Sequence, residues 1–240
     1  MRITGAALVA AAVLATACGS SSSPNPRAAA TPSSTPSASP TVEQSPPAGA
    51  LTSARLKAAL IGVSDLPTGF SKDSVALGTT LLTSATDTAC AKAFQTVNSV
   101  LKSGPVAVFA EAHASFSKGK TGPFLRDSIR SYPTRAAAVR FLADVHSVFT
   151  KCPTFQVTNP TTQRVTAVRL SPLAFPRVGN EGVAVVAELA TRGGSVLRSL
   201  LVFARQGQSI AYVVEIANGA SDAPLLEKAV RAQVAKLTKA

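Results

Sequence analysis

The chain is poor in the residues on which many extracellular enzymes rely. Its 240 residues include no tryptophan, two tyrosines and two histidines, and aromatic residues make up 5% of the total. A glycosidase needs two carboxylates in a cleft, which aromatic rings usually line, so this composition disfavours one. The histidines, His113 and His146, occur in no HExxH or other zinc-ligand spacing. We therefore expect neither a metal nor a cofactor.

Long apolar runs are missing as well. The best candidate, residues 3–17, follows Arg2 and is rich in Ala, Val and Leu. At about 1.5 Å per residue it would span roughly 22 Å of helix, less than the ~30 Å hydrocarbon core of a membrane. A signal peptide over residues 1–17 explains this segment better than a transmembrane helix does.

The apolar run ends in the sequence LATAC at residues 14–18, which resembles a bacterial lipobox. The resemblance implies that the chain is cut before Cys18 and that the Cys18 sulfur carries diacylglycerol. Acyl chains such as palmitate would then hold the protein in the outer face of the cell membrane. Several acyl chains anchor a protein stably, whereas a single chain binds only marginally. Ordinary secretion with a chance cysteine is the alternative.

A tether and one domain are expected after the signal. Residues 18–52 are rich in Ser, Pro, Ala and Thr and show no apolar periodicity, which predicts a disordered tether. Residues 53–240 are numerous enough for one globular domain with its own core. The richness in Ala, Val and Arg is typical of a high-GC bacterium such as an actinomycete.

Cysteine is scarce, and its count is informative. With Cys18 assigned to lipid, two of the three cysteines remain in an oxidising compartment, Cys90 and Cys152. One disulfide between them is the simplest inference, because neither belongs to a CxxC motif or lies near a histidine. It would close a loop of about 60 residues, worth ~4 kcal/mol on the chain-entropy model.

Acidic residues are half as numerous as basic ones, 12 against 24, which gives a net charge of +12. A basic exported protein could favour anionic lipids or anionic wall polymers. The basic residues are scattered, however, and no run of five like charges occurs, so a simple solvated surface explains the charge equally well. Nucleic acid is not an expected partner outside the cell.

Hydrophobic periodicity predicts an α+β domain: a single antiparallel sheet of about six or seven strands, with helices packed on one face. A disulfide would tie the end of the third expected helix to the start of the second. The expected helices are residues 54–62, 87–102, 134–151 with Thr134 as its cap, and a terminal helix that Ser221 caps. The expected strands are 106–116, 124–132, 155–158, 164–170, 183–189, 195–204 and 209–216, with a weaker candidate at 75–83.

Four short phrases stand at recognisable places in this layout: DLPTGF at 65–70, SYPT at 131–134, FTKCPTF at 149–155 and RVGNEGVAV at 177–185. With the lipobox and tether, they resemble the actinobacterial extracytoplasmic sensor-like lipoproteins, whose fold is similar to the external domain of PknH-type receptor kinases. The resemblance covers roughly residues 55–240. It implies ligand binding or sensing at the envelope without catalysis, and it transfers no binding residue.

Motifs of known enzymes are fragmentary. Residues 115–118 fit SxxK and residues 120–122 fit KTG, as in penicillin-recognising enzymes. Those enzymes place the serine at the start of a helix and KTG on a remote strand, whereas the two patterns here are neighbours in one predicted turn. The GKT at 119–121 lacks the first glycine of a P-loop, because residue 114 is alanine. Two pairs of carboxylates could meet in space: Glu111 with Asp127, and Glu181 with Glu188.

Three functional hypotheses follow. The first is a non-catalytic, membrane-anchored lipoprotein that binds or senses an envelope lipid, a glycopolymer or a protein partner. The second is a lipid or glycolipid carrier, in which the apolar faces of sheet and helices enclose a cavity. The third is an envelope hydrolase, which requires serine, histidine and carboxylate to converge in a cleft.

Overall fold

The computed structural model describes residues 46–73, 83–84, 90, 108–158, 165–190, 196–218 and 220–240. The predicted signal peptide, Cys18 and most of the tether lie outside these residues. So do most of the helix expected over 87–102 and most of the weak strand expected over 75–83. No helix in the described ranges combines the length and apolar character needed to cross a membrane.

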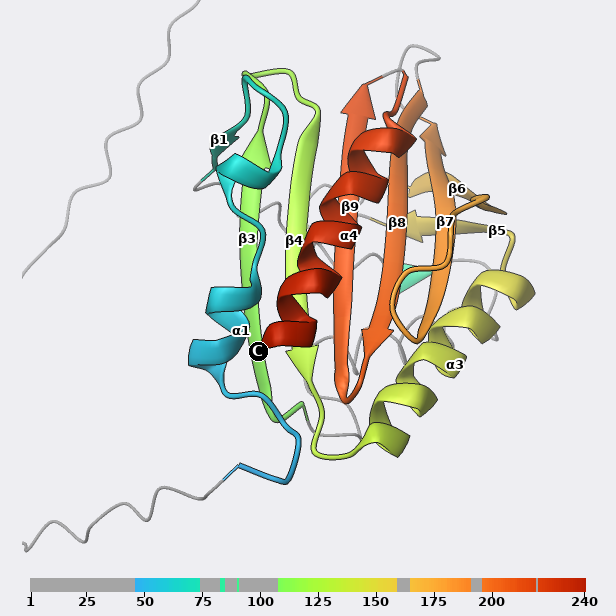
Figure 1. The fold of residues 1–240 in the computed structure, drawn as a ribbon. Helices are drawn as coiled ribbons and strands as arrows, with labels where there is room; N and C mark the ends of the chain where they lie inside the picture. The colour runs from blue at the N-terminus through green and yellow to red at the C-terminus, as the bar shows by residue number, and fades with distance from the viewer. Residues whose placement is uncertain are drawn as a thin grey trace, which may run out of the picture. The chain divides into compact units, whose positions relative to one another are not determined.

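The sheet is antiparallel throughout, as expected, and has nine strands in the order β1-β3-β4-β9-β8-β7-β6-β5-β2 (Figure 1). The two strands beyond the expected seven are two-residue pairings at its edges. The strands are β1 (Ser71–Lys72), β2 (Thr83–Ser84), β3 (Ala110–Ser117), β4 (Phe124–Ser131), β5 (Thr154–Thr158), β6 (Val165–Pro172), β7 (Glu181–Ala190), β8 (Val196–Gln206) and β9 (Ser209–Asn218). The helices are α1 (Ser53–Ala59), the 3-10 turn η1 (Val63–Asp65), α3 (Arg135–Lys151) and α4 (Ala223–Lys239).

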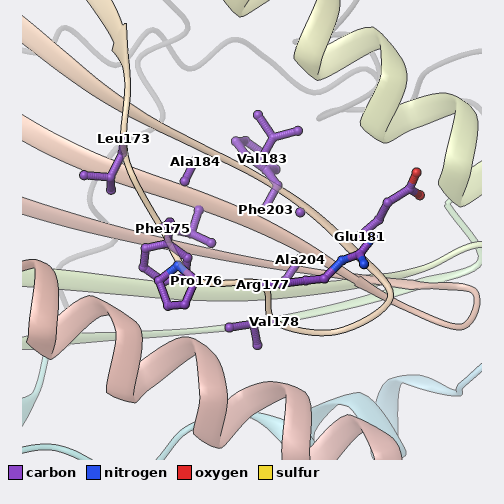
Figure 2. A pocket seen from close by; sticks show the side chains of 12 residues that line it. Leu173, Phe175, Pro176, Arg177, Val178, Glu181, Val183, Ala184, Phe203 and Ala204 are labelled. Carbon is purple, nitrogen blue, oxygen red and sulfur yellow. The ribbon is translucent and has the colours of Figure 1, made fainter.

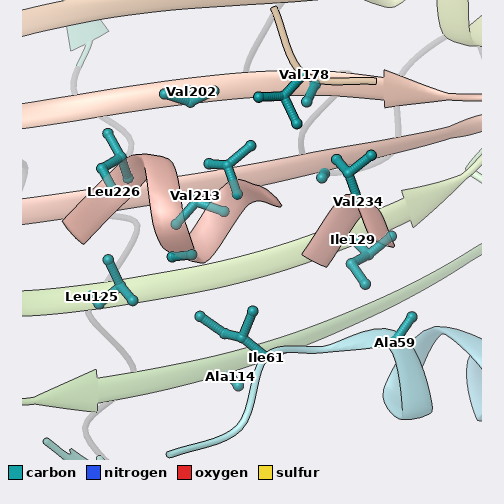
Figure 3. Close-up of a cluster of buried hydrophobic side chains, with 14 of the residues drawn as sticks. Ala59, Ile61, Ala114, Leu125, Ile129, Val178, Val202, Val213, Leu226 and Val234 are labelled. Atoms are coloured by element: carbon teal, nitrogen blue, oxygen red, sulfur yellow. The ribbon is translucent and has the colours of Figure 1, made fainter. Parts of the chain in front are cut away.

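Helix α4 and the segment around α1 cover the main core. In Figure 3 their side chains meet those of the sheet, for example Leu226 of α4 with Val202 and Val213. Leu125 and Ile129 of β4 belong to the same cluster and are fully buried. Leucine and isoleucine at alternate strand positions reach the same face, because successive strand side chains point to opposite sides.

Helix α3 begins as the sequence predicts. The hydroxyl of Thr134 accepts a hydrogen bond from the Ala137 amide at 3.2 Å, which caps the first turn. Phe141 packs at 6.2 Å between ring centroids against Phe203, in a second cluster that includes Ile210. Val202 and Phe203 are consecutive residues of β8, so their side chains point to opposite faces of the sheet. Val202 belongs to the main core and Phe203 to the second cluster, so the sheet carries apolar clusters on both faces.

The predicted disulfide is present. Cys90 and Cys152 are bonded, with their Cα atoms 5.7 Å apart. Both are buried in a third apolar cluster with Phe155, Val168 and Leu170. The bond therefore links a helical residue at position 90 to the end of α3, as expected from the sequence.

The terminal helix begins one residue later than predicted. Asp222, not Ser221, is the cap: its carboxylate accepts a hydrogen bond from the Leu225 amide at 2.9 Å. The Asp222 amide donates in turn to both oxygens of the Glu215 carboxylate, at 2.9 and 3.0 Å. A carboxylate accepts the hydrogen bond from the Leu225 amide more strongly than a serine hydroxyl would, which explains why Asp222 and not Ser221 caps the helix.

Candidate functional site

The residues of the enzyme-like motifs do not form a catalytic arrangement. Ser115 is buried on strand β3 and so does not begin a helix. Lys118 and Lys120 lie between β3 and β4, in a turn where Gly119 and Gly122 have positive φ. The prediction of a turn is confirmed for Lys118 and for KTG at 120–122, whereas Ser115 belongs to strand β3. The two patterns do not form an active site.

The two pairs of carboxylates suggested by the sequence do not meet. Glu111 binds Arg130 on the neighbouring strand at 3.3 Å, while Asp127 occupies the opposite face of β4. Glu181 binds Arg205 at 3.0 Å, and Glu188 lies at the odd spacing of seven along the same strand, hence on the other face. Within the described ranges, no three His, Cys, Asp or Glu side chains gather as a metal site would require.

The histidines stand apart as well. His113 is exposed on β3, and His146 is exposed on α3. Within the described ranges, neither histidine side chain forms the hydrogen bonds to a serine and a carboxylate that a nucleophilic triad would require. Position and exposure are those of ordinary surface histidines, as the sequence indicated.

A pocket of about 310 Å³ lies where the chain leaves β6 and crosses toward β7 (Figure 2). Just beyond the end of β6, the Leu173 amide still donates a hydrogen bond to the Ala184 carbonyl of β7 at 3.0 Å. Beyond it, the crossing segment 173–178 lies over the sheet, and Val178 returns to the main core, where it is buried. The segment thus bridges a space beside the strands without filling it.

Most of the residues that line this pocket have apolar side chains, but polar atoms make up about half of its exposed wall. Figure 2 shows Leu173, Phe175 and Pro176 gathered toward one end, and Arg177 and Glu181 toward the other. Volume and lining fall within the range of small-molecule sites, near its lower limit of roughly 300 Å³. The full lining is Leu173, Phe175, Pro176, Arg177, Val178, Glu181, Gly182, Val183, Ala184, Val202, Phe203 and Ala204.

Arg205 fixes the charged end of the pocket. Its side chain is buried, at 4% exposure, and donates to Glu181 at 3.0 Å, to the Asn180 side chain at 3.3 Å and to the Gly207 carbonyl at 3.1 Å. Its own carbonyl accepts from the Asn180 amide at 2.8 Å. A buried cation with this many partners holds the rim rigidly, because leaving any of them unpaired would be costly.

Gly179 explains the phrase RVGNEG. Its φ is +73°, and a Cβ built there would lie 2.5 Å from the Arg205 carbonyl oxygen. Only glycine permits this close backbone approach without a shift. The sequence contained this signal, a Gly-Asn-Glu just before a strand, but its partner Arg205 is 26 positions along the chain and could not be inferred from it.

A second polar cluster lies beneath α1 and α4. Asp127 is fully buried; its carboxylate accepts from the Ile61 amide at 2.8 Å and from the side-chain amide of Gln233. Burial raises the pKa of Asp127 to about 7, although the Ile61 amide and the Lys236 ammonium act to lower it. Asp127 lies two residues from Leu125 and two from Ile129, so all three side chains share the inward face of β4. The strand pattern alone therefore marks Asp127 as an inward-facing carboxylate.

Lys236 completes this cluster. Its ammonium donates to the Leu60 carbonyl at 3.1 Å and to the carboxylate of Asp65. Burial acts to raise the pKa of Asp65, but the Gly62 amide and Lys236 together hold it below its usual value. These contacts join the first segment of the domain to α4, so we assign the cluster a structural role.

Comparison with known proteins supports the fold alone. No protein-family model matches the chain, and no curated protein matches it. Among solved structures, the extracellular domain of PknH from Mycobacterium tuberculosis superposes with a TM-score of 0.54 at 13% sequence identity, over 80% of this chain and 98% of that one. The fold implied by the short sequence phrases is thus confirmed: the chain is similar in architecture to the extracellular domain of a mycobacterial receptor kinase.

Proposed function

We propose that the protein is an extracytoplasmic lipoprotein, held at the outer face of the cell membrane through Cys18, whose domain binds a ligand in the cell envelope without transforming it. The pocket under segment 173–178 carries this proposal. It combines apolar side chains with polar groups, it has the volume of a small-molecule site, and Arg205 holds its rim in place. The architecture shared with the extracellular domain of PknH supports a role outside the cytoplasm.

The carrier hypothesis is less well supported. A diacyl lipid needs a continuous apolar cavity, whereas the described interior is filled by three packed side-chain clusters. The pocket is near the lower limit of ligand-site volumes, so it suits one apolar group better than two acyl chains. The hydrolase hypothesis lacks the converging serine, histidine and carboxylate in the part of the chain that the structure describes.

Native mass spectrometry of the full chain tests the proposal. The chain is expressed in an actinobacterial host, extracted from membranes in detergent and sprayed intact, with the Cys18→Ser variant collected from the medium as the unlipidated control. We expect one small molecule bound per chain in both preparations. If both masses equal that of the polypeptide, with and without its lipid, the domain does not retain a ligand and the proposal is wrong.

A further inference from the structure

The charges around the pocket do not cancel. Arg205 is paired with Glu181, whose side chain is 49% exposed at the rim. Arg177 also lines the pocket, and no carboxylate among the described residues forms an ion pair with it. Glu181 is thus neutralised by Arg205, which lies outside the lining, and Arg177 is the one charged lining residue without an ion pair.

The uncompensated charge stands opposite the apolar end. Leu173, Phe175 and Pro176 lie toward one end of the space, and Arg177 lies toward the other (Figure 2). Arg177 is exposed, so its guanidinium is solvated when the pocket is empty and can turn toward a bound group. A guanidinium is well suited to a planar carboxylate or to a phosphate, because it offers two parallel donors.

From this arrangement we infer that the pocket binds a single-chain amphiphile with one negative charge, its apolar part against Leu173 and Phe175 and its carboxylate or phosphate at Arg177. This inference rests on the proposed function and specifies the ligand for the same site. A free fatty acid and a lysophospholipid share this chemistry. A neutral sugar lacks the charge, and a diacyl lipid exceeds the pocket, whose volume is about 310 Å³.

The backbone supports the same assignment. Strand β6 pairs with β7 only from Val185 onward, so the apolar end of the pocket borders the first residues of β7, beyond the reach of β6. Ala184 lines the pocket there and presents only a methyl group. A small residue at this position leaves room for the ligand's apolar part, which a larger side chain would occupy.

Fluorescence titration with cis-parinaric acid and with its methyl ester tests the charge assignment on the full-length Cys18→Ser chain. We expect the acid to bind about two- to fivefold more tightly than the ester, the range of a partly exposed charge pair. Arg177→Gln should remove that difference, while Arg177→Lys should retain part of it. Lys120→Gln, which removes a positive charge from the distant β3–β4 turn, should change neither affinity.

Ala184→Leu places a larger side chain in the pocket and should weaken acid and ester alike, with circular dichroism confirming the fold. Competition by oleic acid and by lysophosphatidylglycerol then distinguishes the two sources of the anion. Equal binding of acid and ester in the parent chain, sensitive to Ala184→Leu, would overturn the charge assignment while leaving a ligand pocket. Binding of neither probe, with no small molecule retained in native mass spectrometry, would overturn the pocket itself.

Discussion

Replacing Asp127 by asparagine should stabilise the protein at pH 8 and flatten its stability between pH 4 and pH 8. The Asp127 carboxylate is fully buried and accepts from the Ile61 amide at 2.8 Å. An asparagine oxygen can accept the same bond without carrying a charge. Its amide can also donate to Gln233, whose buried Oε1 has no described hydrogen-bond partner, once that side chain turns over.

The magnitude follows from the pKa. Burial raises the pKa of Asp127 from 3.8 to about 7, so between these values the folded chain holds a proton that the unfolded chain has released. The free energy of unfolding therefore falls as pH rises through this window. The stabilisation that comes from protonating Asp127 is complete below pH 3.8 and lost above pH 7. Because the folded and unfolded pKa values differ by about three units, the loss is at most about 4 kcal/mol.

Two other carboxylates must be separated from this effect. Burial raises the pKa of Glu215 as well, which adds a slope of the same sign. The pKa of Asp65 is lowered, so its contribution is present above its unfolded pKa of 3.8 and is lost only as pH falls below the measured range. Both residues remain in the variant, and the difference between the two stability curves thus reports Asp127 alone.

Urea unfolding at half-unit steps from pH 4.5 to pH 8, followed by circular dichroism at 222 nm, measures the effect without tryptophan. We expect the parent to lose stability with rising pH, and Asp127→Asn to lose much less, so that the variant is the more stable at pH 8. Asp144→Asn on α3 is the control for loss of a carboxylate. Parallel curves for parent and Asp127→Asn would refute the reasoning, because the buried carboxylate would then titrate normally.

Three further changes test other parts of the structure. Cys90→Ser opens a loop with a sequence separation of 62, so we expect a loss near 4 kcal/mol, visible as a melting temperature lower by about 8–15 °C; indifference of the parent to reductant would contradict this. Gly179→Ala places a Cβ 2.5 Å from a backbone oxygen and should cost about 2 kcal/mol or more in urea unfolding, whereas Gly119→Ala, with nothing within 4 Å, should cost less. Cys18→Ser should move the protein from the membrane fraction to the medium, as cell fractionation would reveal; retention in the membrane would disprove the lipid anchor.

Most of the regular elements could be predicted because their sequences are periodic. Helix α3 begins after Thr134 and ends at Lys151, as expected, since a capping threonine precedes a clear apolar stripe and Pro153 follows it. Strands β7 and β8 run further than predicted, to Glu181 and Gln206. Their ends are polar and carry no apolar pattern, but backbone pairing of Glu181 with Arg205 and of Gln206 with Ser209 extends the sheet over these residues.

The candidate site could not be predicted in the same way. A pocket depends on where segment 173–178 crosses the sheet, and a proline-containing connection has no periodicity from which to infer that path. Several residues of the phrases that carried the family resemblance are structural: Gly179 admits a close backbone approach, Asp65 binds Lys236, and Thr134 caps α3. Such residues specify an architecture, which explains why they indicated the fold and transferred no ligand.

The contacts at the beginning of the described chain determine how the domain would bear mechanical load. The Gln208 side chain donates to the Ala48 carbonyl at 2.7 Å, and the Leu51 amide donates to the Ser131 hydroxyl at 2.8 Å. Tension applied through the residues before Pro46 would therefore meet two single hydrogen bonds and then α1, while β4 and β9 are joined along eight residue pairs. The first segment should detach at low force ahead of the sheet, which optical tweezers would record as a short extension before the main unfolding step, and its absence would show that α1 and the sheet yield together.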